Sequence, residues 1–170
     1  MAIGLQFSNE FEAYCTLLGR PRSDPSVREL VSSLDPDAKA QIFDDYLGCF
    51  EFPKHGIAIM LKKGEWLSTE EQDATQFLIE AIHFYSGGYE AFAQYQRNLI
   101  DGVNFFDNQA EVRSKLGEPT STGGGNPNPF NRDKPWPFWD HYDLGKCSVG
   151  LTYSVNEKRL VLITLFLQRR

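Results

Sequence analysis

The chain has 170 residues, of which 41% are hydrophobic and 14% aromatic, and its formal net charge at pH 7 is −6. This length and apolar content suit one compact domain with a real core and exclude a wholly disordered chain. A duplex-binding surface needs a basic patch, so the acidic balance argues against a nucleic-acid partner. No stretch approaches the roughly 18 apolar residues of a membrane span, and no membrane partner is expected.

The cysteines Cys15, Cys49 and Cys147 are odd in number and show no CxxC spacing. This pattern favours reduced thiols over a disulfide framework or a zinc site. The first seven residues lack the basic and long apolar regions of a secretion signal. The sequence therefore predicts a soluble, cytoplasmic protein.

The first half of the chain predicts two helices. Apolar residues recur at helical spacing over residues 7–18, with Ser8 or Asn9 as the N-cap. Gly19 and Pro21 then end that helix. A second helix begins with Asp24 as the cap and Pro25 in the first turn, and it extends to Leu34.

The apolar period then changes to two, which is typical of strands. Residues 46–61 predict a hairpin interrupted at positions 53–56, and residues 77–84 predict a further strand. A polar, acidic insertion at residues 66–75 is expected to be a surface excursion. Residues 87–107 predict a connector, in which positions 103–105 are compatible with a strand or a sheet edge.

The second half repeats this order. Asn108 and Glu111 have the spacing of a capping box for a helix that ends at Leu116. Residues 120–137 are rich in Gly, Pro and Asn and predict an exposed loop. Strands are expected at residues 146–153 and 159–168. The last of these is apolar at nearly every position, so it predicts a central strand covered on both faces.

One four-residue motif occurs twice, as Leu-Gly-Arg-Pro at residues 18–21 and as Leu-Gly-Glu-Pro at residues 116–119. Each copy follows an amphipathic stretch and precedes two alternating runs. Internal similarity of this kind determines the architecture. The predicted fold is α+β, with two tandem helix-then-antiparallel-sheet repeats at residues 1–86 and 108–170, joined by the connector 87–107 and packed into one compact domain.

A helix, then Leu-Gly-x-Pro, then an aromatic-rich strand and two alternating strands, occurring twice, resembles the tandem architecture of the β-lactamase inhibitor protein. One such unit is similar to the small barrel-assembly outer-membrane lipoproteins. Three glycines followed by Trp139-Asp140-x-Tyr142-Asp143 and by Ile163-Thr164-Leu165 resemble a group of bacterial cytosolic proteins, some of which are similar to immunity proteins that neutralise polymorphic toxins. The chain departs from the first two families in having neither paired disulfides nor a lipobox cysteine. The resemblance implies a protein-binding inhibitor.

The candidate contact residues are aromatic and acidic. Aromatic side chains beside exposed loops dominate interface hot spots, and acidic groups steer a basic partner. Trp139 and Tyr142 are predicted to begin a core strand, and Trp136 and Phe138 are harder to bury between prolines. The expected partner-binding residues are Trp136, Phe138, Asp140, His141, Asp143, Asp44, Asp45 and Glu51.

No catalytic residue, metal ligand or cofactor is predicted. His55, His83 and His141 have no accompanying GxSxG or HExxH pattern. The glycines at 123–125 are followed by Asn-Pro-Asn-Pro, which forbids the helix that a phosphate loop needs.

The leading hypothesis is an immunity protein that neutralises a cognate, basic toxin by steric occlusion. Two alternatives remain open at this point. The first is a small hydrolase or metal-dependent enzyme centred on His141, with Asp140 and Asp143 as further ligands. The second is a homo-oligomeric scaffold module that pairs through a sheet edge.

Overall fold

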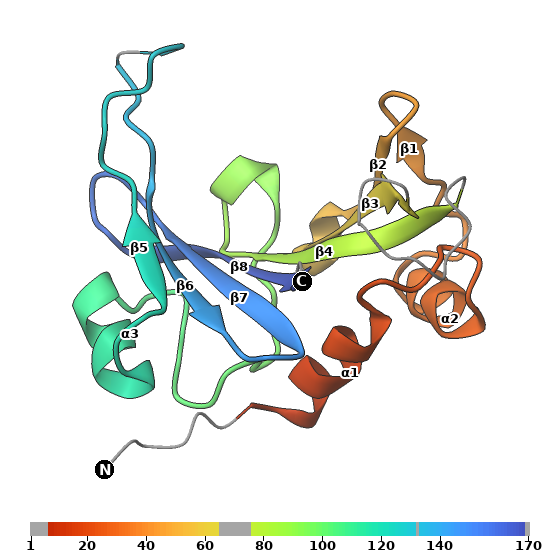
Figure 1. Cartoon of the computed structure of the whole chain (residues 1–170), viewed down its shortest axis with the longest axis horizontal. Helices are drawn as coiled ribbons and strands as arrows, with labels where there is room; N and C mark the ends of the chain where they lie inside the picture. Colours follow the sequence, from red (N-terminus) through yellow and green to blue (C-terminus); the bar gives the residue numbers. More distant parts are fainter. Residues whose placement is uncertain (1–6, 65–75, 132, 169–170) are drawn as a thin grey trace.

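The computed structural model describes residues 7–64, 76–131 and 133–168. In these ranges, three helices lie along one side of a single antiparallel sheet (Figure 1). The strand order across the sheet is β1-β2-β3-β4-β8-β7-β6-β5. The predicted α+β class is confirmed.

The helices are α1 (Asn9–Leu17), α2 (Pro25–Leu34) and α3 (Gln109–Leu116). Short 3-10 turns, η1 (Pro53–His55) and η3 (Tyr89–Ala91), follow β2 and β4. The strands are β1 (Gln41–Ile42), β2 (Leu47–Phe52), β3 (Ile57–Lys63), β4 (Phe77–Tyr85), β5 (Ser121–Gly123), β6 (Phe138–Asp143), β7 (Cys147–Tyr153) and β8 (Leu160–Leu167).

The strand order is symmetric about the contact between β4 and β8, with four consecutive strands on each side. A duplicated unit would give this order, and the duplication itself stays a prediction. Gly19 and Gly117 both adopt a positive φ, 78° and 83°, where their helices end. Their surroundings differ, because Gly19 and Arg20 pair through their backbones with Ile79 of β4, whereas the chain after Gly117 leads into β5.

The helix starts follow the predicted capping chemistry. The Ser8 side chain caps α1 by accepting a hydrogen bond from a first-turn amide, and Asp24 does the same for α2, with Pro25 in the first turn. At α3, Asn108 and Glu111 form the complete capping box. These three predictions are confirmed.

The strand predictions are confirmed in part. The hairpin over residues 46–61 is β2 and β3, joined by η1 and by Gly56 at φ 68°. β4 is the strand predicted at 77–84, whereas residues 103–105 are not a strand. The short strands β1 and β5 were not predicted. The insertion at 66–75 lies outside the described residues.

The core lies between the helices and the inner face of the sheet. Phe11, Val27 and Val112 are fully buried, one from each helix. Burying a large apolar side chain contributes roughly 1.5–3 kcal/mol, so this layer is the main attachment of the helices. The inner face of the sheet contributes mainly Ile57, Ile59, Leu61, Ile82, Phe84, Val149, Leu151, Tyr153, Ile163 and Leu165.

Among the described residues, the other face of the sheet is covered only locally. Tyr85 stacks on Phe92, with ring centroids 3.9 Å apart, in a small cluster that also includes Ala58, Tyr89 and Leu162. The central position predicted for the last strand is correct, since β8 lies between β4 and β7. The prediction that both its faces are covered is wrong, because alternate side chains of β8 are only half-buried.

Candidate interaction surface

The sheet face that points away from the helices forms the candidate site, and we call it the open face. Strand register brings distant residues into one row: His83 is paired with Thr164, Thr164 with Gly150, and Gly150 with His141. Because side chains alternate along a strand, residues two positions away share this face. The open face comprises Met60, Ala81, His83, Trp139, His141, Asp143, Ser148, Thr164 and Phe166.

A hollow of about 660 Å³ lies in the middle of the open face. Small side chains, among them Ala81, Ser148 and Thr164, line it together with the rings of His83 and Phe166. Its volume falls within the range of about 300–1,000 Å³ that is usual for ligand pockets. The hollow is therefore large enough to receive one or two side chains from a partner.

Two histidines with different environments line this hollow. His83 Nδ1 lies 2.9 Å from Thr164 Oγ1, and burial lowers the pKa of His83 to about 4, against an opposing effect of Glu80. His83 is therefore neutral at pH 7. His141 stacks on Phe166 with ring centroids 5.2 Å apart, and its Nε2 has no hydrogen-bond partner in the described part of the chain.

Two projections, which we call the arms, rise from opposite ends of the sheet on the side away from the helices (Figure 1). The first arm is the turn of the β1–β2 hairpin at residues 42–47. The second is formed by the described residues 124–131 and 133–137 between β5 and β6. Eight large hydrophobic side chains are exposed in the described ranges. Seven of them lie in the arms or beside them on β6, and they are Ile42, Phe43, Tyr46, Leu47, Phe130, Trp136 and Trp139.

Hydrogen bonds that backbone amides donate shape both arms. In the first arm, Asp44 Oδ1 accepts the amides of Tyr46 and Leu47 at 2.7 and 2.8 Å. In the second, the Gly125 amide donates to the Trp136 carbonyl at 2.8 Å, and the Trp136 amide donates to Asn126 at 3.0 Å. The arms are therefore structured extensions that hold apolar side chains in water.

Most of the predicted contact residues are accessible. Trp136 is 47% exposed, and Asp44 and Asp45 are exposed in the first arm. Asp143 and Glu51 are also exposed, on β6 and β2. These five residues lie at or around the open face.

Phe138 and His141 are each half-buried. Phe138 packs against the core, with Lys158 Nζ 4.8 Å from its ring centroid. His141 lies on the open face. Of these two side chains, only that of His141 therefore lines the hollow.

The prediction for Trp139 was wrong, while that for Tyr142 is confirmed. Trp139 is 40% exposed and lies over Gly123 of the neighbouring strand β5, whereas Tyr142 is 5% exposed in the core. The two residues are three positions apart on one strand, so they cannot share a face. The period of two was the signal that could have placed Trp139, His141 and Asp143 together on the open face.

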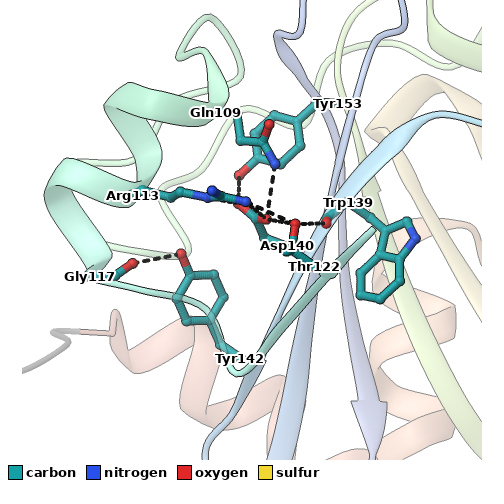
Figure 2. Close-up of polar contacts among 8 residues, drawn as sticks. All are labelled: Gln109, Arg113, Gly117, Thr122, Trp139, Asp140, Tyr142 and Tyr153. Carbon is teal, nitrogen blue, oxygen red and sulfur yellow. Dashed lines mark hydrogen bonds and ion pairs between the residues drawn. The ribbon is translucent and has the colours of Figure 1, made fainter. Parts of the chain in front are cut away.

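Asp140 is not a contact residue, because its side chain is fully buried on the inner face. The prediction that it binds a partner is corrected. Arg113 of α3 binds the carboxylate with two hydrogen bonds of 2.6 and 3.0 Å (Figure 2). Gln109, Thr122 and Tyr153 donate three more, at 3.0, 2.8 and 3.1 Å.

This cluster positions the open face. Burial alone would raise the pKa of Asp140, but hydrogen bonds from Arg113, Thr122 and Gln109 outweigh it, and the net pKa is lowered. The charged carboxylate joins α3, β5, β6 and β7 at one point. Since Asp140 is held inward, its neighbours Trp139 and His141 must point to the opposite face of β6. Figure 2 shows the Trp139 side chain pointing away from the cluster.

The alternative metal site does not form from the residues proposed for it. His141 and Asp143 point to the open face, whereas Asp140 points to the opposite face and is bound by Arg113. Among residues 7–64, 76–131 and 133–168, no three His, Cys, Asp or Glu side chains gather as a metal-ligand set.

Comparison with family models, curated proteins and solved structures finds no match to this chain. In the part of the chain that the structure describes, none of the helices has the length and apolar character that a membrane crossing requires. The functional argument therefore depends on the geometry of the chain itself.

Proposed function

We propose that this protein binds another protein through the open face and the two arms, and that it acts as a cytosolic immunity protein that occludes a toxin. The observation that carries the proposal is the placement of exposed apolar side chains. Seven of the eight in the described ranges flank one sheet face that the helices leave uncovered. Such a concentration in a water-exposed position is typical of a binding surface.

The chemistry of the surface favours a protein partner. Trp136, Trp139 and Tyr46 combine large rings with a polar N–H or O–H group, and such residues are enriched in interface hot spots. Phe43 adds a wholly apolar ring. The hollow accepts an apolar side chain as an anchor, because Met60, Ala81, Phe166 and Leu167 form an apolar part of its lining. The carboxylates of Glu80 and Asp143 also line it. The partner would therefore present a protruding loop that enters between the arms.

The charge of the surface favours a basic partner. Asp44, Asp45, Glu51 and Asp143 are exposed around the open face, and the whole chain has a net charge of −6. Complementary charge mainly raises the association rate and excludes wrong partners. This is the expected arrangement for an inhibitor that must capture a cationic enzyme quickly.

Steric occlusion requires no chemical step from the inhibitor. A partner loop seated in the hollow would be held by its anchor side chain, and the arms would cover the surface on either side. In this mechanism, the Asp140 cluster acts indirectly by fixing the direction of Trp139 and His141.

The test is co-expression with the protein that the neighbouring reading frame encodes, scored by cell growth and by co-purification. The wild-type chain is expected to protect the cells and to recover the neighbour as a complex. Trp139→Ala combined with Phe43→Ala is expected to abolish both effects. Phe106→Ala is the matched control, because Phe106 is the eighth exposed large hydrophobic side chain and lies outside the arms and the open face.

Two results would refute the proposal. One is the absence of both protection and complex formation with the wild-type chain. The other is equal loss of binding in the Phe106 control and the open-face variant. Self-association without a partner, measured by light scattering, would instead support the scaffold alternative, although the edge strands β1 and β5 are only two and three residues long.

A further inference from the structure

Two of the three cysteines lie side by side in the folded chain. Cys15 is on α1 and Cys147 is the first residue of β7, and they are 132 positions apart in the sequence. Their Sγ atoms are 2.7 Å apart. The sequence predicted separate reduced thiols, and it contained no spacing that could have indicated this pair.

We propose that Cys15 and Cys147 form an oxidation site, at which a low-molecular-weight disulfide converts the two thiols into one intramolecular disulfide bond. The proposal stands apart from the function proposed above. The sulfurs need to approach by less than about 1 Å to reach the ~2.05 Å of a covalent bond. The fold therefore holds the reacting atoms together before any oxidant arrives.

The surroundings of the pair give each sulfur a different role, Cys15 as the accessible sulfur and Cys147 as the proton acceptor. Cys15 is half-buried and Cys147 is fully buried, so an oxidant reaches Cys15 first. The hydrogen bond from Cys15, helped by the charge of Lys146, lowers the pKa of Cys147, and the same hydrogen bond together with burial raises the pKa of Cys15. Lys146 also forms an ion pair with Glu12 of α1, which holds the same two elements together.

The chemistry balances with glutathione disulfide as the oxidant. In the reactive state, Cys147 has released its proton to solvent and is a thiolate. The Cys15 sulfur attacks one sulfur of glutathione disulfide while its proton passes to the Cys147 thiolate along the shared hydrogen bond. One glutathione thiolate leaves. The Cys147 sulfur then loses its proton, attacks the Cys15 sulfur in the mixed disulfide and releases the second glutathione. Two cysteine thiols are oxidised by two electrons and one disulfide is reduced. The two protons that the cysteines release to solvent are balanced by the two that the glutathione thiolates take up.

The test treats the full chain with glutathione disulfide, unfolds it, and counts the remaining thiols with a chromogenic thiol reagent. The wild-type count is expected to fall from three to one, with a peptide that links positions 15 and 147 in the non-reduced digest. Cys49, which is buried on β2, is the internal control: Cys49→Ala is expected to fall from two thiols to none. Cys15→Ala and Cys147→Ala are each expected to form no intramolecular disulfide. Cys15 is only half-buried, so Cys15→Ala still gives the result if Cys147→Ala does not fold.

Thermal unfolding gives a second readout. A cross-link over 132 positions restricts the unfolded chain, and it is expected to raise Tm by roughly 10 °C, reversibly on addition of dithiothreitol. Retention of all three thiols in the wild-type chain would overturn the proposal. A disulfide that includes Cys49, or one that joins two chains, would also overturn it.

Discussion

Replacing Asp140 by Ala removes the centre of the buried cluster beneath the open face. The substitution deletes the acceptor of five hydrogen bonds, two of them from Arg113, and leaves that guanidinium without its carboxylate. Removing one partner of a buried ion pair costs about 3–5 kcal/mol. Arg113 retains 31% side-chain exposure and regains some hydration, so we expect the lower end, about 3 kcal/mol.

That loss is a large part of the stability of a domain of this size, which is about 5–15 kcal/mol in total. Urea unfolding is expected to show a lower midpoint with an unchanged slope, and Tm is expected to fall by about 6–12 °C. The control is Glu157→Ala, which breaks only an exposed ion pair with Arg159 and should change the free energy of unfolding by less than about 1 kcal/mol.

A third variant separates charge from packing. Replacing the pair together, Arg113→Met with Asp140→Leu, is expected to recover most of the lost stability, because no buried charge is then left unpaired. A cost below about 1 kcal/mol for Asp140→Ala would refute the view that this cluster attaches α3 to the sheet. The lowered pKa of Asp140 adds a pH test: its contribution is present above the unfolded value of ~3.9 and is lost as the pH falls through the folded pKa.

Three further predictions concern the open face and a turn. The pKa of His83 is lowered to about 4, so the wild-type chain should lose about 2 kcal/mol of unfolding free energy as the pH falls from ~6.5 to ~4. In denaturant titrations, His83→Gln should make the free energy of unfolding less dependent on pH over this range. Gly56 has a positive φ, and Gly56→Ala places a Cβ against the backbone of Ala93 and Tyr95, so it should lower the free energy of unfolding in urea by more than about 2 kcal/mol. Gly102 also has a positive φ but open space around it, so Gly102→Ala should lower this free energy by about 1 kcal/mol. Trp139→Ala should weaken partner binding about 30-fold in a calorimetric titration, and an unchanged affinity would remove Trp139 from the interface.

Local chemistry explains why the helix starts could be predicted from the sequence. Ser8, Asp24 and Asn108 have side chains that accept first-turn amides, and Pro25 has the φ that a first turn requires. The hairpin around Gly56 was likewise indicated, because residues 53–56 interrupt two runs of alternating apolar residues. These signals act over a few residues, so they do not depend on the rest of the fold.

The parts that could not be predicted depend on distant partners. β1 and β5 are too short to show a period, and they exist because β2 and β6 offer them an edge. The inward direction of Asp140 depends on Arg113, which lies 27 positions earlier on a separate helix. The Cys15–Cys147 pair has no sequence signature, since only the packing of α1 on the sheet brings the two sulfurs together.

The position of β8 in the middle of the sheet has a consequence for biosynthesis. β8 follows the other described strands in the chain, and it must insert between β4 and β7. The Ala81–Tyr85 part of the β4 edge therefore stays without its partner strand until roughly 75 further residues have been made, whereas the Phe77–Ile79 part can pair earlier with residues 19–22. At about 5–20 residues per second, this interval lasts several seconds. During that time, the nascent chain presents this five-residue part of the β4 edge to other chains, and we expect chaperones that shield strand edges to bind it.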